Sequence, residues 1–113
     1  MAQDFTKDYK SQVTTSAYTL RTANSNDALI GIRLTNITTS AVTVDVWIDV
    51  AAAGTTASVV YLADDLQIPP KSLVELIQGG AKIVIQTTDL LRIQASAATS
   101  IAAWVSVVDA ISS

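Results

Sequence analysis

Hydrophobic and polar residues alternate with a period of two along much of this chain. The clearest case is residues 41–50, AVTVDVWIDV, where valine or isoleucine fills every second position from residue 42. Successive side chains of a β-strand point to opposite faces, so these apolar side chains form one face that is suited to a hydrophobic core. The opposite face carries Trp47 between Asp45 and Asp49. We therefore expect a strand with a tryptophan on its outer surface.

Segments of this kind recur along the chain and are separated by turn residues. The segments with strand character are 16–22, 28–38, 41–50, 57–63, 72–77, 81–86, 89–95 and 100–111. The turns include ANSND at 23–27, the Pro69-Pro70 pair and the QGG triplet at 78–80, since proline cannot continue a central strand and glycine permits positive φ. We expect 28–38 and 41–50 to pair as a long hairpin, because only a short Thr-Ser connection separates them.

This spacing of about ten residues per strand predicts an all-β fold. We expect an antiparallel β-sandwich of about eight strands, of the jelly-roll or immunoglobulin-like type. The strongest candidate for a helix is the alanine-rich segment 89–105, but its threonine, serine, valine and isoleucine residues favour strands. Residues 1–14 are polar, with isolated Phe5 and Tyr9, and predict an N-terminal arm of the kind that a neighbouring molecule orders. Residues 15–113 are expected to form a single β-sandwich domain.

The amino-acid composition excludes several classes of protein function. Half of the 113 residues are hydrophobic and only 15% are charged, which excludes intrinsic disorder and indicates that part of the surface is not ordinary solvated surface. The net charge is −3 and the lysine and arginine residues are scattered, so nucleic-acid binding is not expected. The absence of cysteine and histidine removes thiolate metal sites, cysteine nucleophiles and the commonest general base. The polar start of the chain shows no secretory signal, and no segment has the continuous apolar character of a membrane span.

No arrangement of polar residues predicts catalysis. Asp45 and Asp49 share a strand face but lie roughly 13 Å apart, which exceeds the separation in glycosidase carboxylate pairs. Adjacent acids such as Asp64-Asp65 can bind Ca²⁺ together with backbone carbonyls, but an acidic turn is the simpler interpretation. The serine and threonine hydroxyls have no histidine to activate them. We therefore expect a protein that is not an enzyme and has no catalytic residue, cofactor or metal site.

The aromatic residues are better candidates for a functional surface. Trp104 lies in the segment IAAWVSVV, which is apolar on both sides, so it either lies at a subunit interface or fills the core. Trp47 is expected to contact a subunit or a ligand, because aromatic residues are enriched in the centres of interfaces. Phe5 and Tyr9 on the arm complete the set of expected interface residues.

Residues 28–111 carry a resemblance to a known group of proteins. The strand that ends in Asn36, the Thr/Ser turn and the valine-alternating strand are followed by IPPK, a small glycine turn, DLLRIQA and a final VSV strand. This order resembles the small virion structural proteins of tailed bacteriophages, especially marine and cyanobacterial ones. Thr88-Asp89 stands where that pattern has Gly-Asp. The resemblance implies a compact β-sandwich with a role in assembly, as capsid decoration or as an accessory ring of the neck or tail.

The leading hypothesis is a non-enzymatic virion protein, most simply a capsid decoration or cement protein that oligomerises and stabilises the particle. Its expected partners are copies of itself, as a trimer or ring, and virion proteins such as the major capsid protein. It would be made in the host cytoplasm and be located in the virion, without binding nucleic acid or membrane. The alternative within the same virion is a neck or tail accessory ring protein.

Two hypotheses come from other functional classes. One is a carbohydrate-binding or adhesion module, in which Trp47 stacks on a sugar while Asp45 and Asp49 bind its hydroxyls. The other is a metal-dependent hydrolase that uses Asp64 and Asp65.

Overall fold

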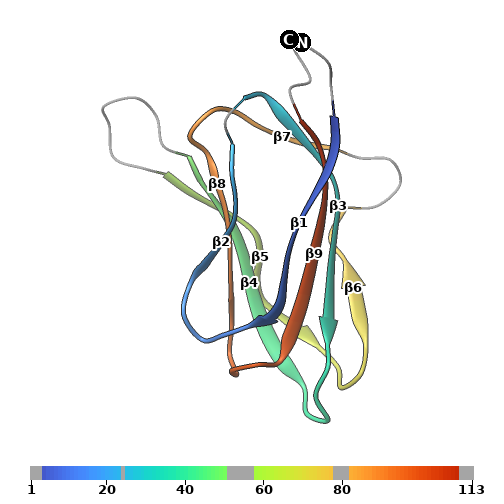
Figure 1. The fold of residues 1–113 in the computed structure, drawn as a ribbon. Helices are drawn as coiled ribbons and strands as arrows, with labels where there is room; N and C mark the ends of the chain where they lie inside the picture. The colour runs from blue at the N-terminus through green and yellow to red at the C-terminus, as the bar shows by residue number, and fades with distance from the viewer. Residues whose placement is uncertain (1–3, 24, 51–57, 78–81, 110–113) are drawn as a thin grey trace.

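Two antiparallel β-sheets pack face to face in the computed structural model, which describes residues 4–23, 25–50, 58–77 and 82–109 (Figure 1). The five-stranded sheet contains β1 (Asp4–Val13), β9 (Ile101–Asp109), β3 (Asp27–Asn36), β6 (Leu73–Glu75) and β7 (Ile83–Ile85). The four-stranded sheet contains β2 (Tyr18–Thr22), β8 (Leu90–Ala95), β4 (Val42–Val50) and β5 (Ser58–Ile68). The prediction of an all-β antiparallel sandwich is therefore confirmed.

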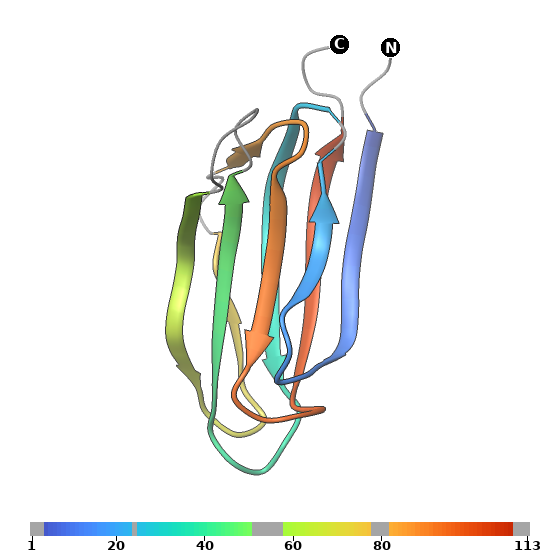
Figure 2. The same ribbon diagram turned by 90° about the vertical axis from the view of Figure 1, so that its left-hand side faces the viewer.

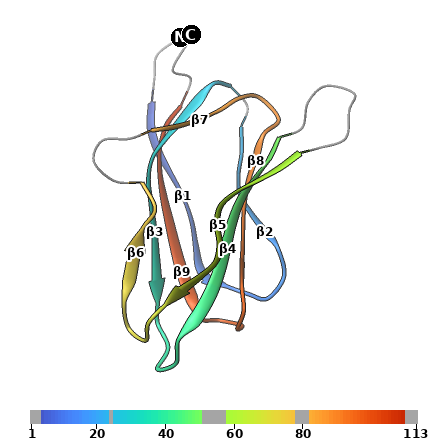
Figure 3. The same cartoon turned by 180° about the vertical axis from the view of Figure 1, so that it is seen from behind.

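The order of the strands in each sheet differs from their order along the chain. The five-stranded sheet runs β1-β9-β3-β6. β7 also pairs with β3, at the start of that strand, whereas β6 pairs near its end (Figure 3). The four-stranded sheet runs β2-β8-β4-β5, and it faces the viewer in Figure 2. The described residues contain no helix, so no helix among them is long and apolar enough to cross a membrane.

The valine face of β4 lies in the core, as its pattern predicts. Val42, Val44 and Val46 are each at most 3% exposed. They pack in one cluster with inward side chains of the opposite sheet, among them Leu34 and Val105. Burying such side chains is the main favourable term in folding, at about 1.5–3 kcal/mol each.

The expected hairpin of residues 28–38 and 41–50 is wrong. β3 pairs with β9, β6 and β7, whereas β4 pairs with β5 and β8, so these two consecutive strands lie in different sheets. Local pattern does not specify a strand's partners, and both strands find longer pairings elsewhere in the chain. The connection between them is therefore a corner of the sandwich.

Asn36 holds this corner. Its side chain is fully buried, and Nδ2 donates hydrogen bonds to the backbone carbonyls of Ser40 at 2.8 Å and Ile68 at 2.9 Å. Its Oδ1 accepts hydrogen bonds from both the backbone N–H and the hydroxyl of Thr38. One amide thus satisfies the polar groups of the connection and also ties it to the end of β5, which is how a buried polar side chain is tolerated.

Replacing Asn36 with alanine is expected to lower the free energy of unfolding by about 2 kcal/mol, because buried backbone groups lose their partners. Urea denaturation of the variant measures this loss. Thr39→Ala, an exposed change in the same connection, should have almost no effect. Equal effects of the two changes would contradict the role assigned to Asn36.

The N-terminal segment also differs from the prediction. We expected residues 1–14 to form a separate arm, but Asp4–Val13 form β1, which pairs with β9 within the same chain. Its side chains alternate between the two faces of the sheet. Phe5 and Tyr9 point outward, while Asp8 forms an ion pair with Arg21 of the other sheet. The described part of this segment is thus an edge strand of the sandwich.

Candidate functional site

The outer surface of the five-stranded sheet gathers half of the exposed large apolar side chains of the described residues. We call this surface the aromatic face; its exposed members are Phe5, Tyr9, Leu73, Val84 and Trp104. They come from β1, β6, β7 and β9, four strands far apart in the sequence. Contiguous exposed apolar surface of this kind marks interaction sites.

Trp104 lies at the centre of the aromatic face. It is 45% exposed, so the alternative that it fills the core is wrong. Its ring stacks on Tyr9 of β1, with centroids 5.6 Å apart and planes at 21°. The Lys7 ammonium lies 6.0 Å from the Trp104 ring, within the range of a cation–π contact. The structure therefore brings together three of the expected interface residues, Phe5, Tyr9 and Trp104, on one surface.

A hollow of about 440 Å³ lies beside Trp104. Gly31 and Ser106, which are cross-strand neighbours, are its small members. Arg33 and Glu75 line it as well, and Arg33 Nη2 donates a hydrogen bond to Glu75 Oε1 at 2.8 Å. These residues could not be selected from the sequence, because the hollow depends on β3 lying between β9 and β6.

Trp47, the fourth expected interface residue, lies on the other sheet and is covered. It occupies the outer side of β4, as its alternation predicts, but it is only 8% exposed. The Tyr61 ring lies 5.8 Å away on one side, and the Arg92 guanidinium lies 6.0 Å away on the other. These cross-strand neighbours come from β5 and β8, which a single strand's pattern does not reveal.

This arrangement argues against the sugar-binding hypothesis. Stacking on a sugar requires an open ring face, and Tyr61 and Arg92 occupy the surroundings of Trp47. Asp49 already forms an ion pair with Arg92 at 3.6 Å. Asp45 accepts a hydrogen bond from the backbone N–H of Asp65. The three residues of that hypothesis are therefore engaged within the chain.

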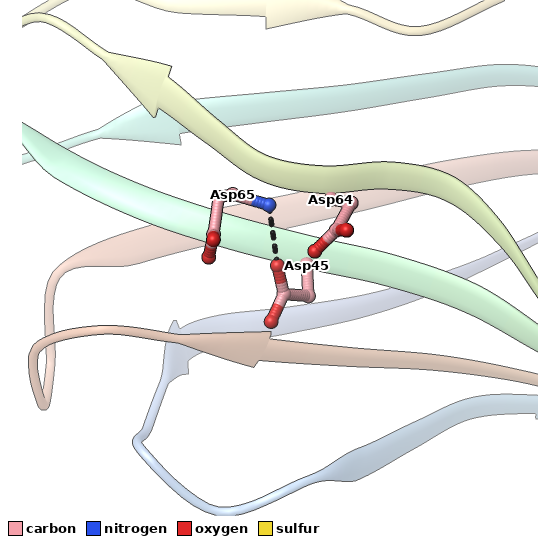
Figure 4. Close-up of side chains that lie close together, drawn as sticks. All are labelled: Asp45, Asp64 and Asp65. Atoms are coloured by element: carbon pink, nitrogen blue, oxygen red, sulfur yellow. Dashed lines mark hydrogen bonds between the residues drawn. The ribbon is translucent and has the colours of Figure 1, made fainter.

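Three carboxylates converge on the same sheet (Figure 4). Asp45 of β4 lies beside Asp64 and Asp65 of β5, and carboxylate oxygens of the three lie within 4.8 Å of one another. Residues 64–65 do not form the expected acidic turn. They are part of β5, at a register irregularity opposite Val44 and Val46, and Asp65 has a φ of 52°. The bulge is what turns both acids toward Asp45.

The acidic group is explained without a ligand. The backbone N–H of Asp65 donates a hydrogen bond of 2.6 Å to Asp45 Oδ1, which holds the bulge in place. β5 is the edge of the four-stranded sheet, and charged residues and bulges are common devices that keep edge strands from pairing with other chains. Oxygen ligands of this type could hold a hard cation, but the geometry is equally that of a protected sheet edge.

Asp64→Asn is expected to raise the free energy of unfolding by about 0.5 kcal/mol at low salt, because it removes one of three like charges that lie close together. Thermal melts at low and high salt measure this, and the gain should shrink as salt screens the repulsion. Asp89→Asn, which changes an acid in a turn outside this group, serves as the control. A loss of stability in Asp64→Asn would contradict a group governed by repulsion.

Comparison with known proteins gives a fold likeness. No protein-family model matches the chain, and no characterised protein matches it by sequence. A chain in a crystal structure of the T13 particle of infectious bursal disease virus overlays 96% of this chain, with a TM-score of 0.60 and 15% identity. The fold resembles a β-sandwich of viral capsid proteins. A structure of the Gx strain of the same virus and one of its VP2 subviral particle overlay the same share, with TM-scores of 0.56 and 0.53 and identities of 14% and 20%.

The likeness concerns one part of those proteins. This chain spans 31–33% of the length of the viral chains that it matches. At such identities the comparison shows the fold alone. The β-sandwich fold is thus supported, and the resemblance to tailed-phage proteins stays a prediction.

Proposed function

We propose that this protein is a non-enzymatic structural protein of a virion, and that it acts as a decoration or cement protein of a tailed-phage capsid. The observation that carries the proposal is the overlay of 96% of the chain on a β-sandwich within virus-particle proteins. A fold alone does not determine function, so the surface must support the same conclusion. The aromatic face provides that support, since the part of the chain that the structure describes leaves its apolar side chains exposed.

The charge pattern also supports an assembly role. Only 15% of residues are charged, and the charged residues of the aromatic face include Lys7 and the ion pair between Arg33 and Glu75. Subunit interfaces are depleted in charged residues at their centres and enriched in tryptophan and tyrosine. The chain has neither histidine nor cysteine, which leaves few groups suited to catalysis near neutral pH.

Co-sedimentation with phage particles tests the proposal. Purified protein is mixed separately with heads and with tails of the phage that encodes it, and bound protein is measured after pelleting. Binding to heads, together with a higher temperature of head disruption, is the expected result. Binding to tails only would favour the neck or tail accessory role, and binding to neither would overturn the proposal. Electron microscopy of particles with the bound protein then locates it.

A further inference from the structure

Gly31 lies in the middle of β3, beside a register irregularity between β3 and β9, and both the space and the backbone conformation there would admit a side chain. Its φ is outside the left-handed region, and an added Cβ would meet the Cβ of Ser106 at 3.7 Å, which is ordinary van der Waals contact. Glycine inside a strand weakens it, and it often marks a place where another molecule approaches closely. Here the missing side chain keeps open the hollow beside Trp104.

Cross-strand pairing divides the aromatic face into rows that run across the strands. One row contains Phe5, Val108, Ala28 and Val84, in order from β1 to β7, and is raised at its two ends by the exposed Phe5 and Val84. The other raised row contains Tyr9, Trp104, Arg33 and Glu75, in order from β1 to β6. Between them lies a lower row of Lys7, Ser106 and Gly31. The face thus has a projecting tryptophan immediately beside a recess.

We propose that the aromatic face binds a second copy of this chain through a two-fold contact, in which Trp104 of each copy enters the hollow of the other. The two-fold axis runs parallel to the strands, between β9 and β3. This inference rests on the proposed assembly role, and it adds to that role a surface through which two copies would associate. A two-fold contact uses the same surface on both copies, so that surface must be complementary to itself.

The rows meet this requirement. Rotation about such an axis places the β1 side of one copy over the β6 and β7 side of the other. Phe5, which is 83% exposed, then lies over Val84, which is 56% exposed. Trp104 lies over Arg33 and the hollow beside it, where a cation–π contact is available. Lys7 of one copy then lies near Glu75 of the other, which has the opposite charge.

The extent of the face fits a pair of copies. Four strand positions about 4.8 Å apart and about eight residues of about 3.3 Å each give roughly 500 Å² of sheet surface. Two copies would therefore cover on the order of 1,000 Å², the lower limit for a specific interface. The contact should accordingly be concentration-dependent rather than permanent.

Light scattering coupled to size-exclusion chromatography, over about 1–200 µM protein, tests the proposal. The mass should rise from 11.9 kDa toward twice that value as concentration increases. Gly31→Val should abolish the rise by filling the hollow, and Trp104→Ala should abolish it by removing the side chain that enters it. Gly31→Val is the sharper variant, because valine favours strands and should leave the melting temperature unchanged or higher. Val59→Ser removes an exposed apolar residue of the other sheet and should leave the rise intact.

Mixing the two variants tests the reciprocal geometry. Gly31→Val keeps its Trp104, and Trp104→Ala keeps Gly31 and the other lining residues of its hollow although it loses one wall. One contact can therefore form in a mixed pair although neither variant pairs with itself. Weaker but measurable dimers in the mixture, and none in the separate variants, are expected. A mixture that stays monomeric would overturn the insertion of Trp104 into the hollow.

The remaining outcomes separate this inference from the proposed function. A wild-type protein that binds phage heads but stays monomeric at every concentration overturns the inference and leaves the function standing. The same holds if the protein oligomerises and both variants oligomerise equally well. A protein that dimerises as described but binds no particle supports this contact and overturns the proposed function.

Discussion

Arg21→Met is expected to lower the free energy of unfolding by about 3–5 kcal/mol, because it leaves a buried carboxylate without its counter-charge. Arg21 of β2 is 11% exposed, and its Nε donates a hydrogen bond of 2.9 Å to Asp27 of β3, whose side chain is fully buried. Its Nη1 donates a second bond of 2.9 Å to Asp8 of β1. Asp109 of β9 completes the group at 3.5 Å from Nη2. One guanidinium therefore joins β2 of one sheet to three strands of the other.

The protonation of Arg21 supports this role. Burial disfavours its charge, but the hydrogen bonds that it donates to Asp8 and Asp27 outweigh this effect and raise the pKa of the guanidinium. A pKa that is raised by folding contributes stability at every pH below the ordinary arginine range and loses it only at higher pH. The loss in Arg21→Met should accordingly be the same at about pH 7 and about pH 9.

Chemical denaturation of Arg21→Met at a protein concentration where the chain is monomeric measures the loss. Arg33→Met is the matched control, because its ion pair with Glu75 is about half exposed on both sides and should contribute at most about 0.5 kcal/mol. In the double variant Arg21→Met with Asp27→Asn, part of the loss should be recovered, since the buried charge is also gone. Equal small losses in Arg21→Met and Arg33→Met would show that the buried group contributes little.

Local pattern predicted the strands well because alternation is a property of a few neighbouring residues. Each predicted segment that lies within the described residues contains a strand, and the valine face of β4 is buried as expected. Pairing was not predictable in the same way. The neighbours of β3 and β4 are set by contacts between distant segments, so the expected hairpin failed where Asn36 turns the chain between sheets.

The same distinction explains the candidate site. Phe5, Tyr9 and Trp104 could be selected as interface residues from their type and position, but only the pairing of β1 with β9 brings Tyr9 onto Trp104. Gly31 had no signal in the sequence beyond being a glycine inside a strand pattern. Thr88 has a φ of 77°. Glycine adopts this conformation readily, and glycine stands at this position in the phage pattern.

Replacing Trp47 with alanine is expected to lower the free energy of unfolding more than replacing Trp104. Trp47 is 8% exposed and packs between Tyr61 and Arg92. Its replacement by alanine should lower the free energy of unfolding by about 3 kcal/mol. This value is at the lower end for a buried tryptophan, because Tyr61 and Arg92 can partly close the space. Trp104→Ala should cost about 1 kcal/mol, mainly the stacking on Tyr9. Denaturation of the monomeric variants measures both values.

Fluorescence separates the two residues directly, because the chain has only these two tryptophans. In Trp104→Phe, the emission of Trp47 should be blue-shifted and poorly quenched by acrylamide at every protein concentration, since its cover comes from its own chain. In Trp47→Phe, the emission of Trp104 should be readily quenched in dilute protein and become protected as concentration rises, since its cover comes from a second copy. Ready quenching of Trp47 would contradict its burial under Tyr61 and Arg92. Quenching of Trp104 that does not change with concentration would place the contact between copies on another surface.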